Sequence, residues 1–197
     1  MGRLTFIIGG ARSGKSSYAE RVAGQESQKV LYVATGQALD EEMRARIASH
    51  RAKRPVQWET VELPTEVGSY LLARPPEADV VIVDCLTLLV SNLVLQAAPD
   101  VDHPDEAIAK VKLQAEIGQL LRAANEIPAH WLVVSNEVGQ GLVPPYAMGR
   151  VFRDLLGWVN QRLAEKADEV YWMVAGIAVP VGGYRTGPPV NRQIAID

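Results

Sequence analysis

The feature that most constrains the fold is a glycine-rich stretch near the N-terminus, from Gly9 to Ser16. It reads G-G-A-R-S-G-K-S and so matches the pattern G-x-x-x-x-G-K-S of a phosphate-binding loop. An apolar run at residues 4–8 precedes it, and a helix-forming segment begins near Ser16. This is the order of strand, loop and helix that such a loop requires. The start of the chain is therefore predicted to form a nucleotide-binding loop between a strand and a helix.

Each part of this loop suits a nucleoside triphosphate with magnesium. The backbone N–H groups of such a loop point inward, and the following helix adds the positive end of its dipole. Lys15 can reach the outer phosphates, and the Ser16 hydroxyl can bind Mg²⁺. The predicted phosphate contacts are Gly9, Gly10, Ala11, Arg12, Ser13, Gly14, Lys15 and Ser16.

Composition favours one domain that acts on small molecules. A chain of 197 residues with 48% hydrophobic content can bury one sizeable core. Twenty basic residues against 23 acidic ones give a net charge of -3, without the basic excess that nucleic acids or anionic membranes attract. The single Cys85 excludes a disulfide framework, and no apolar run is long enough to span a membrane. We expect a cytoplasmic protein.

Short β-branched runs alternate with longer helical patterns, which predicts an α/β domain of three layers. Most strand candidates are apolar throughout, as in a parallel sheet that is covered on both faces. The predicted strands are residues 4–8, 30–34, 56–61, 80–83, 131–134 and 170–174. The predicted helices are residues 16–24, 39–53, 64–73, 86–96, 105–126 and 146–166. We expect the domain to cover residues 1–181, followed by a tail, rich in Gly, Pro and polar residues, at 182–197.

A second nucleotide-binding element is the apolar strand candidate at residues 80–83, which leads directly into Asp84. In phosphate-loop proteins an aspartate at the end of a neighbouring strand lies near the loop hydroxyl and helps to hold magnesium. The alternative is an aspartate that caps the following helix. Because the phosphate loop is present, Ser16 and Asp84 are predicted to bind Mg²⁺. Cys85 is expected to be a small buried residue.

The segment from Asp40 to Pro55 carries a different kind of chemistry. On a helix that starts near Asp40, the side chains of Arg46, His50 and Arg54 share one half-apolar side. The alternative is an ordinary basic helix end in solvent, but clustered cations on such a side favour an anionic partner such as a polyphosphate. An imidazole among cations is shifted toward its neutral form, which leaves a ring nitrogen able to act as a nucleophile. His50 is therefore the candidate nucleophile.

Taken together, these segments resemble the bifunctional adenosylcobinamide kinase/adenosylcobinamide-phosphate guanylyltransferase family of cobalamin biosynthesis. The resemblance covers nearly the whole chain, and its most specific parts are the histidine segment and the sequence S-N-E-V-G at residues 135–139. The matching stretches are residues 9–16, 31–35, 40–55, 58–62, 83–87, 135–139, 143–144, 152–154 and 159–164.

The resemblance implies two reactions on one chain. Family members phosphorylate the aminopropanol hydroxyl of adenosylcobinamide with ATP or GTP. They then transfer GMP from GTP to that phosphate, releasing pyrophosphate and giving adenosylcobinamide-GDP. The family's covalent guanylyl-histidine falls on His50, while Lys15 and Asp84 are expected to serve both reactions with Mg²⁺. The nucleotide contacts implied beyond the phosphate loop are Ala34, Thr35, Gly36, Arg51, Ala52, Lys53, Arg54, Glu62 and Asp84.

The resemblance also implies a RecA-like fold and a homotrimer with its sites near a subunit boundary. Two other functions stay open at the level of sequence. A small-molecule kinase without nucleotidyl transfer would need only the phosphate loop and Asp84. A RecA-like ATPase or nucleotide-controlled binding module would act on a polymer or partner protein, but the chain lacks the basic charge and added domain expected for it. His103 and His130 are expected to be structural.

Overall fold

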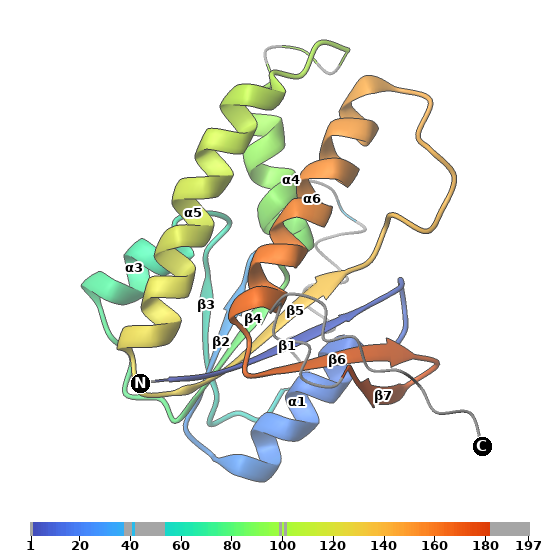
Figure 1. Ribbon diagram of the computed structural model, residues 1–197. Helices are drawn as coiled ribbons and strands as arrows, with labels where there is room; N and C mark the ends of the chain where they lie inside the picture. Colours follow the sequence, from blue (N-terminus) through green and yellow to red (C-terminus); the bar gives the residue numbers. More distant parts are fainter. Residues whose placement is uncertain (1, 38–40, 42–53, 99, 101, 182–197) are drawn as a thin grey trace, which may run out of the picture.

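A computed structural model describes residues 2–37, 41, 54–98, 100 and 102–181 of the chain. In these residues, seven strands form one sheet with helices on both faces (Figure 1). The predicted helix at 39–53, which carries His50, lies outside the described residues except for Glu41, and the predicted tail at 182–197 lies wholly outside them. The proposed division at residue 181 therefore stays a prediction.

The sheet has the strand order β3-β2-β4-β5-β1-β6-β7. Every neighbouring pair is parallel except the last, since β7 runs antiparallel to β6. The strands are β1 (Arg3–Gly9), β2 (Val30–Ala34), β3 (Glu59–Glu62), β4 (Val80–Asp84), β5 (His130–Asn136), β6 (Glu169–Val174) and β7 (Ile177–Pro180). The central strands are buried almost along their whole length, which explains why their sequences are apolar throughout.

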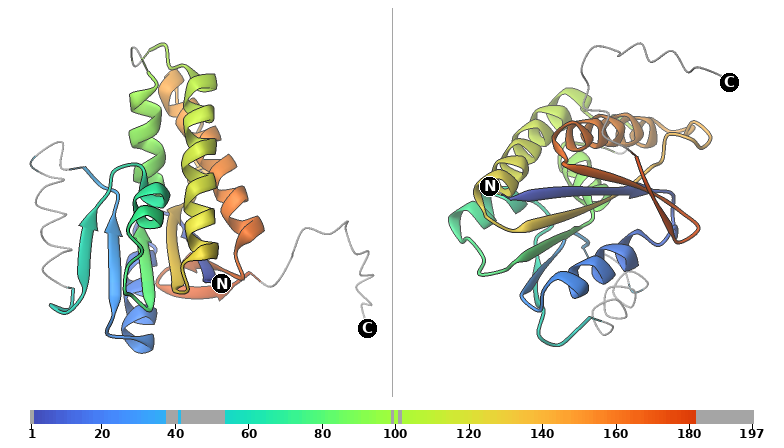
Figure 2. Two further views of the ribbon diagram at one scale, coloured as in Figure 1. Left: turned by 90° about the vertical axis from the view of Figure 1, so that its left-hand side faces the viewer. Right: turned by 60° about the horizontal axis from the view of Figure 1, so that its bottom comes forward.

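Helices cover the two faces unequally, and each face has its own core. The helices are α1 (Lys15–Glu26), α3 (Val67–Ala73), α4 (Leu86–Gln96), α5 (Glu106–Glu126) and α6 (Ala147–Lys166). Figure 2 shows α1 on one side of the sheet and α5 and α6 on the other. Trp131 is buried in the larger core, under α3 to α6, whereas Tyr32 and Trp58 are buried in the smaller core with α1. The predicted three-layer α/β architecture with a mainly parallel central sheet is confirmed.

The predicted elements agree closely with the observed ones, with three differences. The strand predicted at 56–61 begins at Glu59, and the strand β7 was not predicted. The helix predicted at 64–73 begins at Val67, because the buried Glu116 carboxylate of α5 accepts the backbone N–H groups of Glu66 and Val67 at 2.7 and 2.8 Å. That cap comes from a distant helix, so local sequence could not reveal it.

The parallel order places the functional segments along one edge of the sheet. The register pairs Gly9 with Asn136 and Ala34 with Asp84, so β1, β2, β4 and β5 end at similar heights. In open α/β sheets, ligands bind outside the carboxyl ends of the strands. No helix in the described part of the chain combines the length and apolar character needed to cross a membrane.

Candidate active site

The phosphate loop connects β1 to α1 in a conformation that depends on Gly14. Gly14 precedes α1 and has φ 94°, in the left-handed region that favours glycine. A Cβ atom at this position would lie 3.1 Å from the Cα of Gly176, in the turn between β6 and β7. The Gly176 N–H also donates to the Ser13 carbonyl at 2.9 Å, so this turn supports the loop from the side.

Lys15 is the first residue of α1, and only 7% of it is exposed. Its Nζ atom donates to the Gly10 carbonyl at 2.6 Å and lies 3.4 Å from the Ser13 hydroxyl. Burial lowers the pKa of the Lys15 ammonium below its ordinary value, while the negative charge of Asp84 opposes that shift. The ammonium therefore lies within the loop, close to where the phosphates of a nucleotide would bind.

Asp84 ends β4 and is half-buried beside the phosphate loop. Its Oδ2 atom accepts a hydrogen bond of 2.5 Å from the hydroxyl of Tyr32, a residue of β2 that is 1% exposed. Burial, followed by the charge of Asp84, raises the pKa of Tyr32 far above its ordinary value. The Tyr32 hydroxyl therefore stays protonated, and it acts as the donor in this bond.

Arg54 covers one face of the Tyr32 ring. Its guanidinium carbon lies 3.3 Å from the ring centroid, and its Nε atom lies 3.9 Å from a carboxylate oxygen of Glu20 on α1. Only 8% of the Arg54 side chain is exposed. Arg54 is the first described residue after His50 and belongs to the end of the histidine segment, so this segment ends beside Tyr32 and Asp84.

Thr35 is fully buried, and its hydroxyl is used within the protein. The Thr35 Oγ1 atom donates to the Cys85 carbonyl at 2.7 Å and accepts from the Cys85 N–H at 2.9 Å. Asn92 of α4 adds a bond from Nδ2 to the Thr35 carbonyl at 2.9 Å. These bonds join the ends of β2 and β4. Burial raises the pKa of the Cys85 thiol to about 11, as expected for a small core residue.

The segment after β5 lies directly beside the phosphate loop. The Glu137 N–H donates to the Gly9 carbonyl at 3.1 Å, and the Glu137 carboxylate accepts a bond from the Gly139 N–H. Buried Asn160 of α6 holds the end of β5 by accepting from the Ser135 hydroxyl at 2.6 Å and donating to the Asn136 carbonyl at 3.1 Å. The backbone of Glu137, a half-buried residue, thus lies next to the first glycine of the loop.

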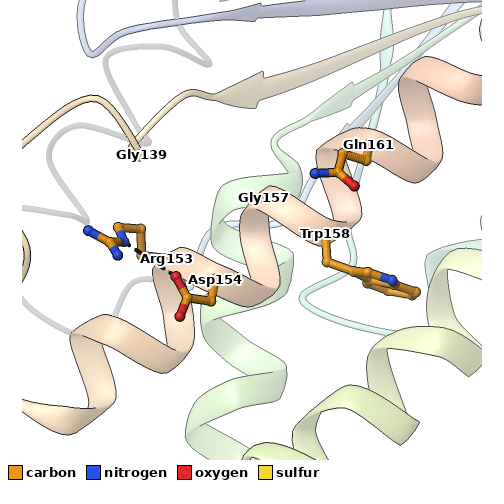
Figure 3. A pocket seen from close by; sticks show the side chains of 6 residues that line it. All are labelled: Gly139, Arg153, Asp154, Gly157, Trp158 and Gln161. Atoms are coloured by element: carbon orange, nitrogen blue, oxygen red, sulfur yellow. Dashed lines mark hydrogen bonds and ion pairs between the residues drawn. The ribbon is translucent and has the colours of Figure 1, made fainter.

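A pocket of about 460 Å³ opens between Gly139 and one side of α6 (Figure 3). Its lining residues are Gly139, Arg153, Asp154, Gly157, Trp158 and Gln161. Charged, amide and indole groups therefore line this pocket. Its lining residue Gly139 lies two residues after Glu137, which bonds to the Gly9 carbonyl. A larger pocket of about 820 Å³ is lined by Arg3, Leu4 and Asp168 at the opposite edge of the sheet, away from the phosphate loop.

Most of the predicted site residues lie at one edge of the sheet, where the parallel strands end. They are spread along this edge and do not form one cluster. Gly9 to Ser16, Ala34 to Gly36, Arg54 and Asp84 lie at or beside the ends of β1, β2 and β4. Glu62 ends β3, which β2, β4 and β5 separate from β1, so the two strands lie about 19 Å apart. A nucleotide bound at the phosphate loop reaches Glu62 only if it extends along the edge. His50, Arg51, Ala52 and Lys53 lie outside the described residues.

Sequence reasoning did not assign a role to Tyr32 or Glu137, although both belong to matched stretches. Tyr32 has the pattern of an ordinary core residue in a buried strand, and its contact with Asp84 joins residues 52 positions apart. For Glu137, the signal that could have found it is its position directly after β5, the strand that pairs with β1.

Magnesium fits the chemistry of the residues that are present. Ser16 offers a hydroxyl and Asp84 a carboxylate, and Mg²⁺ bound with a nucleotide takes one or two protein oxygens along with phosphate oxygens. Within the described ranges, no group of three or more His, Cys, Asp or Glu side chains is placed to hold a metal by itself. The site therefore suits a metal that arrives with its nucleotide.

Comparison with known proteins agrees with this geometry. The model of the family described as "Cobinamide kinase / cobinamide phosphate guanyltransferase" matches residues 5–181. The bifunctional adenosylcobalamin biosynthesis protein CobU of Escherichia coli is 44% identical over 181 residues, covering 90% of this chain and 99% of that protein. Its counterpart in Salmonella typhimurium is 42% identical over 180 residues, with the same coverage of both chains.

A third relative and one solved structure complete the comparison. The bifunctional protein CobP of Pseudomonas aeruginosa is 41% identical over 178 residues, covering 90% of this chain and 96% of that protein. The crystal structure of the RadB recombinase matches with a TM-score of 0.48 and 17% identity, covering 87% of this chain and 74% of that one. Since a family model covers most of the chain, and relatives above 40% identity align over nearly their whole length, this chain belongs to the cobinamide kinase/cobinamide phosphate guanyltransferase family.

Proposed function

We propose that this protein phosphorylates adenosylcobinamide and then transfers GMP from GTP to the resulting phosphate. The observation that carries the proposal is the placement of Lys15, Asp84 and the end of the histidine segment at one edge of the sheet, in a chain of this family. A single triphosphate site would then serve two reactions that differ in the phosphorus atom attacked.

The kinase step uses the phosphate loop and its neighbours. The acceptor hydroxyl oxygen attacks the γ-phosphorus of ATP or GTP, the bond to the bridging oxygen breaks, and the hydroxyl proton is released. The loop N–H groups and Lys15 bind the phosphate oxygens, and Ser16 and Asp84 would hold the Mg²⁺ of the nucleotide. When bound, the magnesium ion neutralises negative charge on the phosphates.

The transferase step needs a nucleophile, which we assign to His50. A ring nitrogen of His50 attacks the α-phosphorus of GTP, pyrophosphate leaves, and the phosphate of the acceptor then displaces the histidine from GMP. His50 lies outside the described residues, so its role stays a prediction from sequence. Support comes from Arg54, four residues later, whose guanidinium stacks on Tyr32 beside Asp84.

The expected setting is a homotrimer in the cytoplasm. The resemblance to the family supports the trimer and a site close to a subunit boundary. The single cysteine, a buried thiol, suits a reducing compartment. The predicted partners are ATP or GTP and adenosylcobinamide or its phosphate, with no nucleic acid.

Product analysis tests this proposal directly. The purified protein is incubated with adenosylcobinamide, GTP and Mg²⁺, and adenosylcobinamide phosphate and adenosylcobinamide-GDP are separated by chromatography. We expect both products in wild type, and a loss of both of at least 100-fold in Lys15→Ala and Asp84→Asn, since one site serves both steps. Formation of the phosphate alone would identify a plain kinase. Full activity of Lys15→Ala would contradict the phosphate-loop assignment.

A further inference from the structure

Two side chains from separate parts of the chain, Tyr32 and Arg54, form a stack beside the predicted magnesium ligand Asp84. Tyr32 from β2 donates its hydroxyl to Asp84 Oδ2 at 2.5 Å, and Arg54 lies over the Tyr32 ring at 3.3 Å from its centroid. Tyr32 is 1% exposed and the Arg54 side chain 8% exposed, so little water reaches the stack. The roles assigned above to the phosphate loop and to Asp84 do not explain why a tyrosine and an arginine occupy this place.

The Tyr32 hydroxyl is placed to control the direction of the Asp84 carboxylate. Asp84 is the last residue of β4, and a carboxylate there can rotate about its side-chain bonds. A hydrogen bond from a buried phenol to one oxygen fixes that rotation, because the rigid ring cannot follow a rotating carboxylate. Partners of this kind, which contact a ligand of the metal and not the metal itself, commonly set metal affinity.

At its Nε atom, Arg54 is held by the contact with the Tyr32 ring and not by a hydrogen bond to any described residue. Its Nε atom is buried with no hydrogen-bond partner among the described residues, and the Glu20 carboxylate lies 3.9 Å away from it. A planar guanidinium stacks on an aromatic face, and burial strengthens this attraction. Arg54 thus covers one face of the Tyr32 ring, whose hydroxyl bonds to Asp84.

We propose that Tyr32 is a positioning residue that orients Asp84 for the magnesium of the nucleotide, and that Arg54 holds Tyr32 in place. The inference rests on the proposed function in one respect, because it takes Asp84 as a magnesium ligand. It adds that the end of the histidine segment is connected to Asp84 through Arg54 and Tyr32. Loss of the Tyr32 hydroxyl should therefore weaken the binding of magnesium with the nucleotide. Nucleotide binding without metal should stay unchanged.

The test measures how strongly metal and nucleotide binding are coupled. Isothermal titration calorimetry gives the Kd of a non-hydrolysable GTP analogue, first with EDTA and then with saturating Mn²⁺ as a substitute for Mg²⁺. The ratio of the two Kd values is the coupling factor. Tyr32→Phe keeps the ring under Arg54 and removes only the hydroxyl, so the coupling factor should fall about tenfold or more, while the Kd in EDTA stays unchanged.

Two further variants make the result specific. Tyr70→Phe on α3 is the matched control, because Arg74 lies over the Tyr70 ring at 4.9 Å but this pair is remote from the phosphate loop, and the coupling factor should not change. Arg54→Lys keeps the charge and loses the planar stack, so a smaller decrease in coupling is expected. Its Kd in EDTA reports any direct contact between Arg54 and the nucleotide.

The possible outcomes distinguish the positioning role of Tyr32 from the assignment of Asp84 as a magnesium ligand. A coupling factor that falls in Asp84→Asn but not in Tyr32→Phe would overturn the positioning role and leave Asp84 as a metal ligand. A coupling factor that stays unchanged in Asp84→Asn would overturn the metal role of Asp84, and the inference with it. A fall in both variants, with Tyr70→Phe unaffected, is the expected result. Equal melting temperatures of Tyr32→Phe and wild type would show that the effect is not a loss of folding.

Discussion

At the scale of single residues, Lys15 combines a function in phosphate binding with a cost in stability. Its ammonium is buried, and its Nζ atom bonds to the Gly10 carbonyl at 2.6 Å within the loop. Burial disfavours the charged form and lowers the pKa of Lys15. Groups arranged for a ligand often destabilise the protein without its ligand.

Lys15→Met should therefore stabilise the ligand-free protein while abolishing nucleotide binding. We expect the free energy of unfolding at pH 7.5, measured by urea denaturation, to rise by about 1 kcal/mol, with no comparable rise in Lys29→Met on the exposed surface. The pKa of Lys15 in the folded protein lies below its ordinary value of 10.5. Between the folded pKa and pH 10.5, the unfolded chain therefore binds more protons than the folded protein. Wild-type stability then rises with pH across this interval, and the difference between the two proteins shrinks. A Lys15→Met protein less stable than wild type at pH 7.5 would contradict this.

The residue scale also shows what the sequence could and could not reveal. Lys15, Ser16 and Asp84 were predicted as site residues because a fixed spacing and the end of a strand indicate them. The Tyr32 hydroxyl was not, because its contact with Asp84 depends on β2 and β4 being neighbours in the sheet. Strand neighbours are set by tertiary packing, which local patterns do not record.

At the scale of elements, the hairpin of β6 and β7 supports the phosphate loop. The turn at Ala175 and Gly176 has φ values of 49° and 84°, and Gly176 bonds to Ser13. The residue pattern offered little sign of β7, since an alanine at positive φ is not the usual turn residue of a two-residue hairpin. Its neighbour β6 was predicted, because that run is longer and more apolar.

Gly14→Ala tests this support, with Gly10→Ala as its control. An alanine at residue 14 must adopt φ 94° and brings its Cβ to 3.1 Å from Gly176, whereas nothing lies within 4 Å of a Cβ at residue 10. We expect Gly14→Ala to lower the free energy of unfolding by about 1–2 kcal/mol, and Gly10→Ala to change it far less. Urea denaturation without nucleotide measures both. Equal losses in the two variants would show that the turn does not constrain the loop.

At the scale of the whole molecule, the strand order explains how one edge can serve two reactions. β5 lies between β4 and β1, so Asp84, Glu137 and the phosphate loop follow three adjacent strands. The alternation of strands and helices predicted this architecture. The order of the strands, the pocket beside Gly139 and the cap on α3 all depend on contacts between distant segments, and the sequence left them undetermined.

We propose that one nucleotide site carries out two chemistries, of which only one needs His50. Phosphoryl transfer depends on positioning and charge, whereas transfer of GMP through a covalent intermediate needs a nucleophilic side chain. Removal of His50 should thus separate activities that Lys15→Ala removes together. His103 lies exposed beside Asp100 and His130 is buried between Thr5 and Glu26, so both serve as control positions.

The most direct measurement is covalent labelling with GTP that carries radioactive phosphorus at the α-position. Wild type, His103→Ala and His130→Ala should all retain label in a bond that is labile in acid and stable in alkali, as expected of a phosphoramidate. His50→Ala should retain none and should form no adenosylcobinamide-GDP, while it keeps much of its kinase activity. Undiminished labelling of His50→Ala would contradict the assigned nucleophile, and formation of adenosylcobinamide-GDP by wild type without any label on the protein would contradict the covalent route.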